Sequence, residues 1–553
     1  MSFNSLFRKK SADEVLKHGD PSAEQHTLHK VLRVRDLTFF GIAAIIGGGT
    51  FSAIGNACFS GGPGVIFLYL ICAVACGFTA LCYAEFASRV PVSGSAYTYA
   101  YVSFGELFAW IIGWALLMEY SIGNIYIAFS WSGYFTNLLD GMGAHIPEWL
   151  SINYSEAHVA FLDNKTGSEG FLAWAAAPEI GGLKVIFDLP AVIINAIITA
   201  LVYIGTKESR NISNAMVIIK LIIIALVILV GIFYINIDNW TPFMPNGFSG
   251  VMGAVSGVFF AYIGFDAVST LAEECENPQR DLPRGMIYSL IICTVVFIIL
   301  CLVLTGMASY SLLGVNDPLA EIFKIKGVKW MLFVVSIAAV VAMASVLLVF
   351  QMGQPRIWMA MSRDGLLPKK FSKIHPKYKT PGFATIITGL VVGLPLFFTN
   401  EKFVLDFTSI GTLFAFVLVC GGVLMLPRQA KRNDKKFQLP YINAKWIMPV
   451  ICITTFALLF KYNSEYLLAR FEITGENAAK NVPMLIYFIL FIVLSVFSFI
   501  KNLSLIPVLG LLSCCYLLTG MEAQNWKFFS IWLLIGLVVY LCYGYRKSKL
   551  AKK

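Results

Sequence analysis

The chain alternates between long apolar runs and short polar segments along most of its 553 residues. Many of the apolar runs extend for about 20 residues, the length that an α-helix needs to cross the hydrocarbon core of a bilayer. The pattern therefore predicts an all-α polytopic membrane protein with about 14 transmembrane helices. The expected spans are 38–60, 65–88, 106–139, 187–206, 213–235, 249–272, 286–309, 330–361, 383–399, 403–426, 446–464, 483–500, 503–521 and 527–545.

The composition supports this class and argues against several others. Hydrophobic residues make up 58% of the chain and charged residues only 13%, whereas an ordinary soluble domain carries roughly 25% charged residues. A soluble enzyme, a disordered chain and a nucleic-acid partner are therefore not expected. The chain has no G-x-x-x-x-G-K-[ST] loop for ATP, and its six histidines fall in tails or loops. We therefore expect no cofactor, no metal site and no catalytic residues.

The distribution of basic residues predicts the orientation. With the N-terminus in the cytoplasm, the inner segments hold 30 Lys and Arg residues and the outer loops hold 9. Positive charge is retained on the cytoplasmic side, so both termini are expected to be cytoplasmic in a multi-pass protein of the cell membrane. The expected organisation is an N-terminal tail (1–37), helices 1–10 (38–426), a basic linker (427–445), helices 11–14 (446–545) and a basic C-terminal tail (546–553).

The first span contains three consecutive glycines, Gly47, Gly48 and Gly49. Each glycine inside a helix costs about 1 kcal/mol relative to alanine. Close packing between helices is one explanation, but packing motifs space their small residues by four so that they share a face. An unwound stretch with exposed amides is the better explanation, and unpaired backbone at that depth is tolerated only where it lines a cavity.

The sixth span also carries glycines near its centre, and it carries the carboxylate of Asp266. Spans 1 and 6 cross the bilayer in opposite directions, and such a pair of interrupted spans is typical of secondary transporters with inverted repeats. A substrate site is then expected between the two breaks. The free amides at helix N-termini can bind a carboxylate, and backbone carbonyls without a helical partner can bind an ammonium group. The two breaks together predict a site for an α-amino acid.

Three charged residues lie deep within the predicted spans: Glu119, Lys220 and Asp266. A charge at the bilayer centre costs at least about 2.5–3.5 kcal/mol, so each requires an explanation. Lys220 fits either a salt bridge that holds the bundle together or a cation held against unwound carbonyls, where a sodium ion would otherwise sit. Glu119 and Asp266 fit a structural ion pair and proton coupling equally well.

Other charges lie near the ends of spans. Glu85 and Arg89, at the inner end of span 2, are expected to form a gate or an anchoring network. Arg356 and Lys461 are expected to extend toward the membrane surface, because long basic side chains can bury their stems and keep their charge in water. The acidic loop at 140–186 holds two short glycosylation sequons, at Asn153 and Asn164, whose use the sequence leaves open.

Five motifs in order resemble the amino acid–polyamine–organocation superfamily, and within it the cationic amino acid transporter family. The resemblance extends from about residue 30 to residue 546. The motifs are Gly41-Ile-Ala-Ala-Ile-Ile-Gly47-Gly48-Gly49, Cys82-Tyr-Ala-Glu85-Phe-Ala, Gly205-Thr-Lys-Glu208-Ser, Phe259-Phe-Ala-Tyr-Ile-Gly-Phe-Asp266 and Ser362-Arg363-Asp364-Gly365-Leu-Leu-Pro368.

The resemblance implies a leucine-transporter-like core of five plus five inverted repeats, with helices 1 and 6 discontinuous and helices 11–14 peripheral. It implies that the substrate carboxylate meets the first break and that the amino group meets carbonyls of the sixth-span break. Lys220, Glu119 and Asp266 match charged positions of the family. The implied substrate-binding residues are Ile45, Gly47, Gly48, Gly49, Phe260, Ala261 and Ile263.

The expected function is a secondary active amino acid permease that works by alternating access, is sodium-independent, and is either proton-coupled or exchanging. The expected partners are the amino acid, protons and the lipid bilayer. A sodium-coupled symporter of the same fold is the first alternative, and a channel or membrane sensor is the second. Relatives often have Thr at Gly48 and Asp at Ala115, so the preferred side chain stays open, as do the coupling ion, the direction of transport, the oligomeric state and any accessory subunit.

Overall fold

The structure is a computed structural model that describes residues 7–10, 30–47, 49–315, 318–399, 401–426, 437–462, 464–471, 478–521 and 523–551. Nearly all of the regular structure in these residues is helical, as the apolar runs predict. The exception is a small antiparallel hairpin formed by β1 (Glu179–Ile180) and β2 (Leu183–Lys184).

The long helices fall on the predicted spans. They are α4 (Val65–Arg89), α6 (Glu106–Gly141), α10 (Thr206–Ile232), α13 (Pro278–Met307), α15 (Lys329–Arg363), α17 (Glu401–Met425), α20 (Ala478–Lys501) and α22 (Ala523–Val539). Shorter apolar helices are α9 (Leu189–Ile204), α16 (Gly382–Gly393), α18 (Ile447–Tyr462) and α21 (Leu505–Leu518). In the described part of the chain, 8 helical stretches are long and apolar enough to cross a membrane. The total of fourteen crossings stays a prediction.

The first span is not one continuous α-helix. Helix α2 (Val34–Ile45) ends at Ile45, and Ile46 adopts an extended conformation with φ −83° and ψ 94°. A short π-helical turn, η2 (Gly49–Ala53), follows, and it leads into α3 (Ile54–Gly61). The described residues therefore contain a helix interruption where the glycines predict one.

The sixth span is interrupted as well. Helices α11 (Gly247–Gly253) and α12 (Val255–Tyr262) are followed by Ile263 in an extended conformation and by Gly264 with φ 115°. This φ value favours glycine, because a side chain would be strained there. The chain then continues as a 3₁₀-helix, η6 (Phe265–Glu274).

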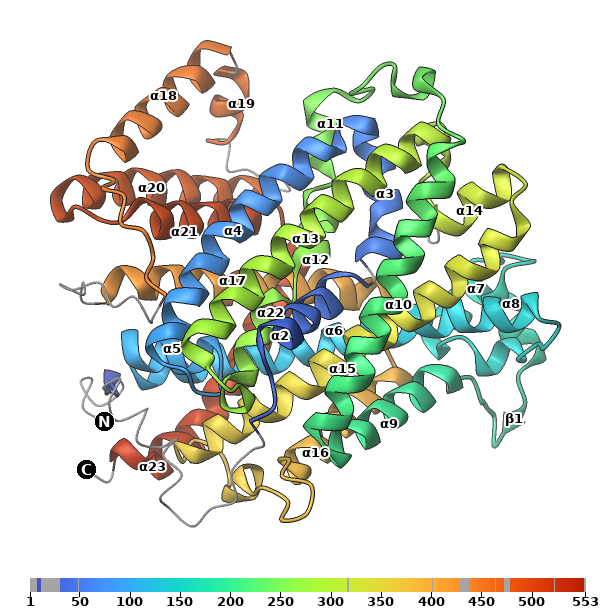
Figure 1. Ribbon diagram of the computed structural model, residues 1–553, viewed down its shortest axis with the longest axis horizontal. Coiled ribbons are helices and arrows are strands. Elements are labelled where there is room, and N and C mark those ends of the chain that lie inside the picture. Colours follow the sequence, from blue (N-terminus) through green and yellow to red (C-terminus); the bar gives the residue numbers. More distant parts are fainter. Residues whose placement is uncertain are drawn as a thin grey trace.

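The two interrupted spans lie inside a layer of long helices. Helix α2 packs against α10, α13, α15 and η6, and it lies near the middle of the view in Figure 1. The longest helix, α6, crosses behind and packs against α15 and α17. These contacts bury the breaks within the protein.

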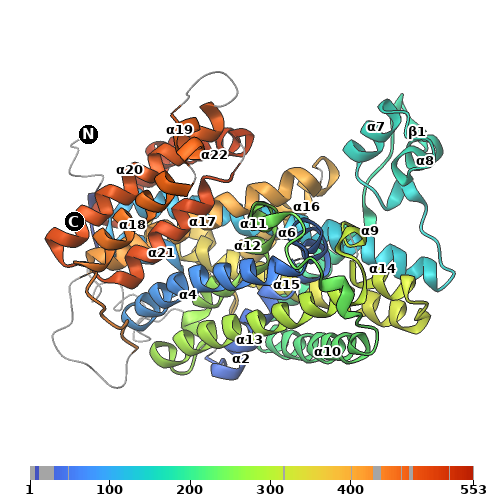
Figure 2. The ribbon, with the colours of Figure 1, turned by 90° about the horizontal axis from the view of Figure 1, so that it is seen from above.

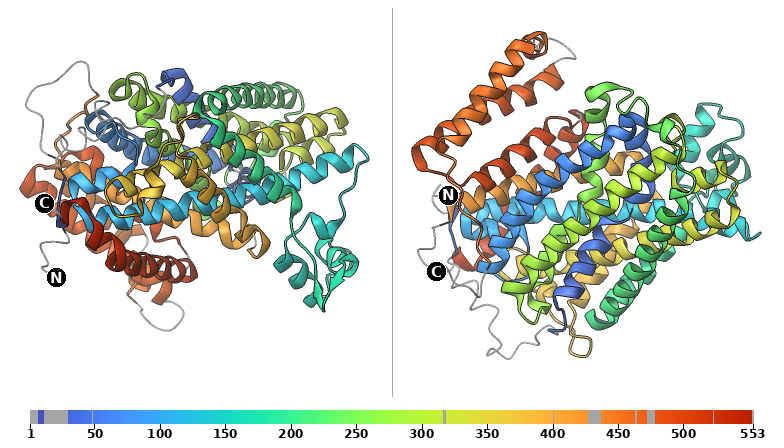
Figure 3. Two further views of the ribbon diagram at one scale, coloured as in Figure 1. Left: turned by 90° about the horizontal axis from the view of Figure 1, so that it is seen from below. Right: turned by 45° about the horizontal axis from the view of Figure 1, so that its top comes forward.

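Other elements lie at the edges of the molecule. Helices α18, α20 and α21 share a small hydrophobic cluster of their own, and the views in Figures 1 and 3 place α18 and α20 at one edge of the molecule. At the opposite end, α7 (Tyr154–Leu162), α8 (Glu169–Ala176) and the hairpin project from the helices (Figure 2). Asn153 is 3% exposed and caps α7 by accepting the amide of Glu156, so this sequon is not presented for glycosylation.

The described ends of the chain lie together. Lys10 forms an ion pair with Asp364, and the backbone amide of Lys549 donates to the backbone oxygen of Asp364 at 3.0 Å. The Arg8 guanidinium lies 5.4 Å from the centre of the Tyr545 ring. The described segments at the two ends of the chain therefore lie together beside Asp364, at the C-terminal end of α15.

The remaining described helices are short. They are α5 (Ala96–Ser103), α14 (Pro318–Ile325), α19 (Ser464–Ala469), α23 (Tyr545–Lys547) and the 3₁₀ turns η3 (Gly62–Gly64), η4 (Glu148–Leu150), η5 (Ile237–Trp240), η7 (Tyr310–Leu312), η8 (Lys369–Ser372), η9 (Pro395–Phe397) and η12 (Lys549–Ala551), with one further π-helical turn, η11 (Tyr540–Gly544).

Candidate binding site at two helix breaks

The two breaks touch each other. A side chain at Gly49 would overlap the backbone of Ala261, so only glycine fits this approach. On the other side, a Cβ atom at Gly264 would lie 2.6 Å from the Cβ of Ala44. Each break thus contacts the last helical turn that precedes the other break, and each glycine permits that contact.

The break of the first span exposes backbone amides. The amides of Thr50 and Phe51 both donate to the Gly47 oxygen, at 2.9 and 3.0 Å. The amides of Gly47 and Gly49 have no backbone acceptor among the described residues. Ile45 is buried at the end of α2. Gly48, which is also predicted to bind substrate, lies outside the described residues.

The break of the sixth span exposes carbonyl groups. Helix α12 ends at Tyr262, so the carbonyls of its last turn lose their helical partners. Among the described residues, the Ile263 amide donates to the Phe260 oxygen at 3.1 Å and closes the last turn of α12 as a 3₁₀ bond. Phe260, Ala261 and Ile263 are all buried. The Phe260 ring packs edge-on against Tyr126 of α6, with ring centres 5.3 Å apart.

Lys220 reaches from α10 to the end of α2. Its fully buried ammonium donates to the backbone oxygens of Ile42 at 3.2 Å, Ala43 at 3.1 Å and Ile46 at 2.7 Å, and to Ser345 Oγ at 2.9 Å. The carbonyls at a helix C-terminus lack partners within the helix and carry partial negative charge. Lys220 supplies both the hydrogen bonds and the positive charge that this interrupted helix end needs.

These contacts distinguish the two explanations of Lys220. Among the described residues, no carboxylate lies within ion-pair distance of its ammonium. The geometry is that of a cation held by carbonyls.

Sequence reasoning does not identify Ser345 of α15 as a partner of Lys220, because nothing in a single apolar run shows which hydroxyl faces α2. The sequence offers one indication of Ser345, namely that it is a polar residue inside the apolar run 338–350.

Glu119 and Asp266 lie near each other in the protein interior. Both are fully buried, on α6 and at the start of η6, and their charges interact. Both oxygens of Asp266 and both oxygens of Glu119 are buried without a hydrogen-bond partner among the described residues. Neither carboxylate forms a salt bridge with a described residue, so the structure gives no support to a structural ion pair.

Glu85 and Arg89 form an anchoring contact. The Arg89 guanidinium donates to Glu85 Oε1 at 2.7 Å, and the other Glu85 oxygen accepts the backbone amide of Leu439 at 2.6 Å. One turn away, Ser88 Oγ donates to the Phe437 oxygen at 2.7 Å. The end of α4 thereby holds the segment that leads into α18.

The expectation for Arg356 is wrong. Its side chain is 1% exposed, and its guanidinium donates to Glu274 Oε1 at 2.8 and 2.5 Å rather than extending to the membrane surface. A neighbouring pair joins Arg363 to Glu273 at 2.7 Å. Both arginines lie on α15 and both acids lie at the end of η6, so the second half of the sixth span is tied to α15 by two ion pairs.

Comparison with known proteins agrees with this geometry. Residues 32–497 match the model of the amino acid permease family, and residues 503–548 match that of the C-terminus of the same permeases. The chain is 36% identical to the branched-chain amino acid permease BcaP of Bacillus subtilis over 547 residues, which cover 99% of each chain. It is 39% identical to the methylthioribose transporter of Bacillus subtilis, covering 81% of this chain and 90% of that one.

A third relative is the vacuolar cationic amino acid transporter 4 of Arabidopsis thaliana, which is 31% identical and covers 99% of this chain and 96% of its own. The apolar helices, the two breaks and these matches define the class as a membrane transport protein rather than an enzyme. The chain belongs to the amino acid permease family of the amino acid–polyamine–organocation superfamily, which confirms the relationship that its motifs predict.

Proposed function

We propose that this protein is a secondary active permease for α-amino acids that works by alternating access in the cell membrane, with both termini cytoplasmic. We further propose that its first ten crossings form two inverted repeats and that the substrate binds between the two breaks. The family match supports amino acid transport. The backbone contact between Gly49 and Ala261 supports the location, because it brings exposed amides and exposed carbonyls together.

In the proposed complex, the amides of Gly47, Gly48 and Gly49 bind the substrate carboxylate. The carbonyls of Phe260, Ala261 and Ile263 bind its ammonium group, with Ile45 beside them. Each charged group of the substrate would then meet the end of a half-helix with the opposite partial charge. The side chain of the substrate would face α6, where Tyr126 already contacts Phe260.

The observation that carries the proposal is the position of the Lys220 ammonium on three backbone oxygens at the end of α2. The Lys220 ammonium there takes the place of a sodium ion, since both bind unpaired carbonyl oxygens. Transport would therefore be independent of sodium and driven by protons or by exchange.

The neighbouring carboxylates of Glu119 and Asp266 provide the support for proton coupling. Two buried acids in one site cannot both stay charged without a large cost, so one of them tends to hold a proton. A change in the surroundings of either residue during alternating access would release or capture that proton. Exchange of one amino acid for another needs no such step and remains the alternative.

Transport by purified protein in proteoliposomes tests the proposal. Twenty amino acids and methylthioribose would compete with a labelled substrate at two pH values, with and without external sodium. We expect competition by α-amino acids, none by methylthioribose, which lacks both charged groups, and no change on removal of sodium. Uptake that requires sodium would favour the sodium-coupled symporter and overturn the assignment of Lys220.

A further inference from the structure

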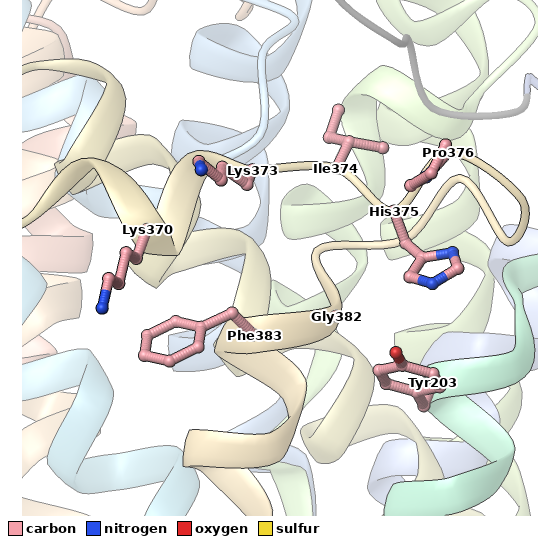
Figure 4. A pocket seen from close by; sticks show the side chains of 8 residues that line it. All are labelled: Tyr203, Lys370, Lys373, Ile374, His375, Pro376, Gly382 and Phe383. Carbon is pink, nitrogen blue, oxygen red and sulfur yellow. The ribbon is translucent and has the colours of Figure 1, made fainter.

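A second site lies away from the two breaks, where α9 ends and α16 begins. The connection between α15 and α16 folds over these helix ends and leaves an open cavity of about 360 Å³. Figure 4 shows Tyr203 and His375 along one side of this cavity and Lys370 and Phe383 on the opposite side, with Lys373 above them. None of these residues belongs to the proposed transport site.

His375 is held in a defined orientation. Its Nδ1 atom accepts the backbone amides of Lys377 at 3.3 Å and Tyr378 at 3.2 Å. The ring stacks on Tyr378, with ring centres 4.9 Å apart, and meets the edge of Tyr203 at 5.6 Å. Because Nδ1 is an acceptor, the neutral ring carries its proton on Nε2, which is a donor for an anionic ligand.

The cavity is strongly basic. The segment 366–381 contains five lysines and no acidic residue. Lys370 and Lys373 line the cavity, both are exposed, and neither forms an ion pair with a described residue. Two ammonium groups and an imidazole N–H suit the oxygens of a phosphate group.

The cavity continues into an apolar surface. Phe383 on its wall is 39% exposed, and Ile386 and Leu390 follow on the same face of α16 with 47% and 50% exposure. Helix α9, which packs against α16, also exposes Ile204, the residue that follows Tyr203 of the cavity wall. In a membrane protein these apolar side chains face acyl chains. A ligand that is anionic at one end and apolar at the other matches this surface, whereas a soluble phosphate does not need it.

We propose that this cavity binds an anionic phospholipid of the adjacent leaflet. Its phosphate accepts the Nε2 proton of His375 and is joined by the ammonium groups of Lys370 and Lys373. These ammonium groups point away from His375 in Figure 4 and reach the phosphate by rotation of their exposed, flexible side chains. One acyl chain lies along the face of α16 formed by Phe383 and Ile386. The position of the lysines at a helix end suits this role, because basic residues at the bilayer surface attract anionic headgroups.

Native mass spectrometry of the delipidated, full-length protein tests the proposal. Phosphatidylglycerol is titrated against phosphatidylcholine for the wild type and for the double variant Lys370→Gln with Lys373→Gln. The matched control is Lys501→Gln with Lys547→Gln, which removes two exposed lysines expected on the same side of the membrane. Thermal unfolding without lipid checks that all three proteins are equally folded.

We expect the wild type and the control to retain phosphatidylglycerol in preference to phosphatidylcholine. The cavity variant should bind phosphatidylglycerol about 30-fold more weakly, since each lysine at an anionic surface contributes roughly fivefold to affinity. Equal loss in the control, or equal binding of phosphatidylcholine, would show nonspecific attraction and overturn the proposal. Displacement of the lipid by millimolar inorganic phosphate would also overturn it, because the site would then recognise a soluble anion.

Discussion

Replacement of Lys220 by methionine is the sharpest single perturbation of the proposed mechanism. The substitution removes the ammonium but keeps an unbranched side chain of similar length. Three backbone oxygens of α2 then lose a charged donor. A hydrogen bond to a charged group contributes roughly 1.5–3 kcal/mol. A net loss of about 3 kcal/mol in the transport-competent state corresponds to a decrease in rate of about 100-fold.

The assay is initial uptake into proteoliposomes, normalised to the amount of folded protein recovered in a single gel-filtration peak. Lys461→Met is the control, because Lys461 is an exposed residue of the peripheral helix α18. We expect uptake to collapse for Lys220→Met and to stay at the wild-type rate for the control. Wild-type uptake by a well-folded Lys220→Met protein would refute the idea that this ammonium organises the first break.

Three further substitutions test other parts of the site. Ser345→Ala removes one neutral partner of the buried ammonium and should lower uptake roughly fivefold, a loss of about 1 kcal/mol. Gly49→Val should abolish thermal stabilisation by amino acids, because the valine side chain would overlap Ala261 at the opposite break. Gly133→Val is the control and should keep the stabilisation, since the space around its Cβ is open. Equal stabilisation of the two variants would contradict the site. Glu274→Gln removes the charged partner of the buried Arg356 and should lower the free energy of unfolding by about 3–5 kcal/mol. An unchanged unfolding temperature would contradict a stabilising role for this ion pair.

The helix breaks could be predicted from local sequence because backbone energetics determine them. Consecutive glycines weaken a helix wherever the chain places them, and Gly264 adopts a φ value that favours glycine. Lys220 could be singled out for a similar reason, since a lone charge inside an apolar run demands partners. These signals depend on one segment at a time, so a single sequence contains them.

The partners of these residues could not be predicted in the same way. The hydroxyl of Ser345 faces Lys220 only because α15 packs against α2 and α10 in a particular register. From the sequence alone, Arg356 is expected to extend to the membrane surface. In the structure it pairs with Glu274 at the end of η6, a residue 82 positions away in the chain. Such contacts depend on how the helices are arranged, and hydropathy does not report that arrangement.

The central claim is that the two breaks bind both charged groups of an amino acid. The most direct measurement is the affinity of the purified protein for its preferred amino acid, for the methyl ester and for the N-acetyl derivative, by isothermal titration calorimetry. The ester lacks the carboxylate charge and the acetyl derivative lacks the ammonium charge. We expect each derivative to bind at least about 100-fold more weakly, because a lost charge-assisted hydrogen bond costs roughly 3 kcal/mol. Binding of either derivative with the affinity of the parent amino acid would contradict the claim.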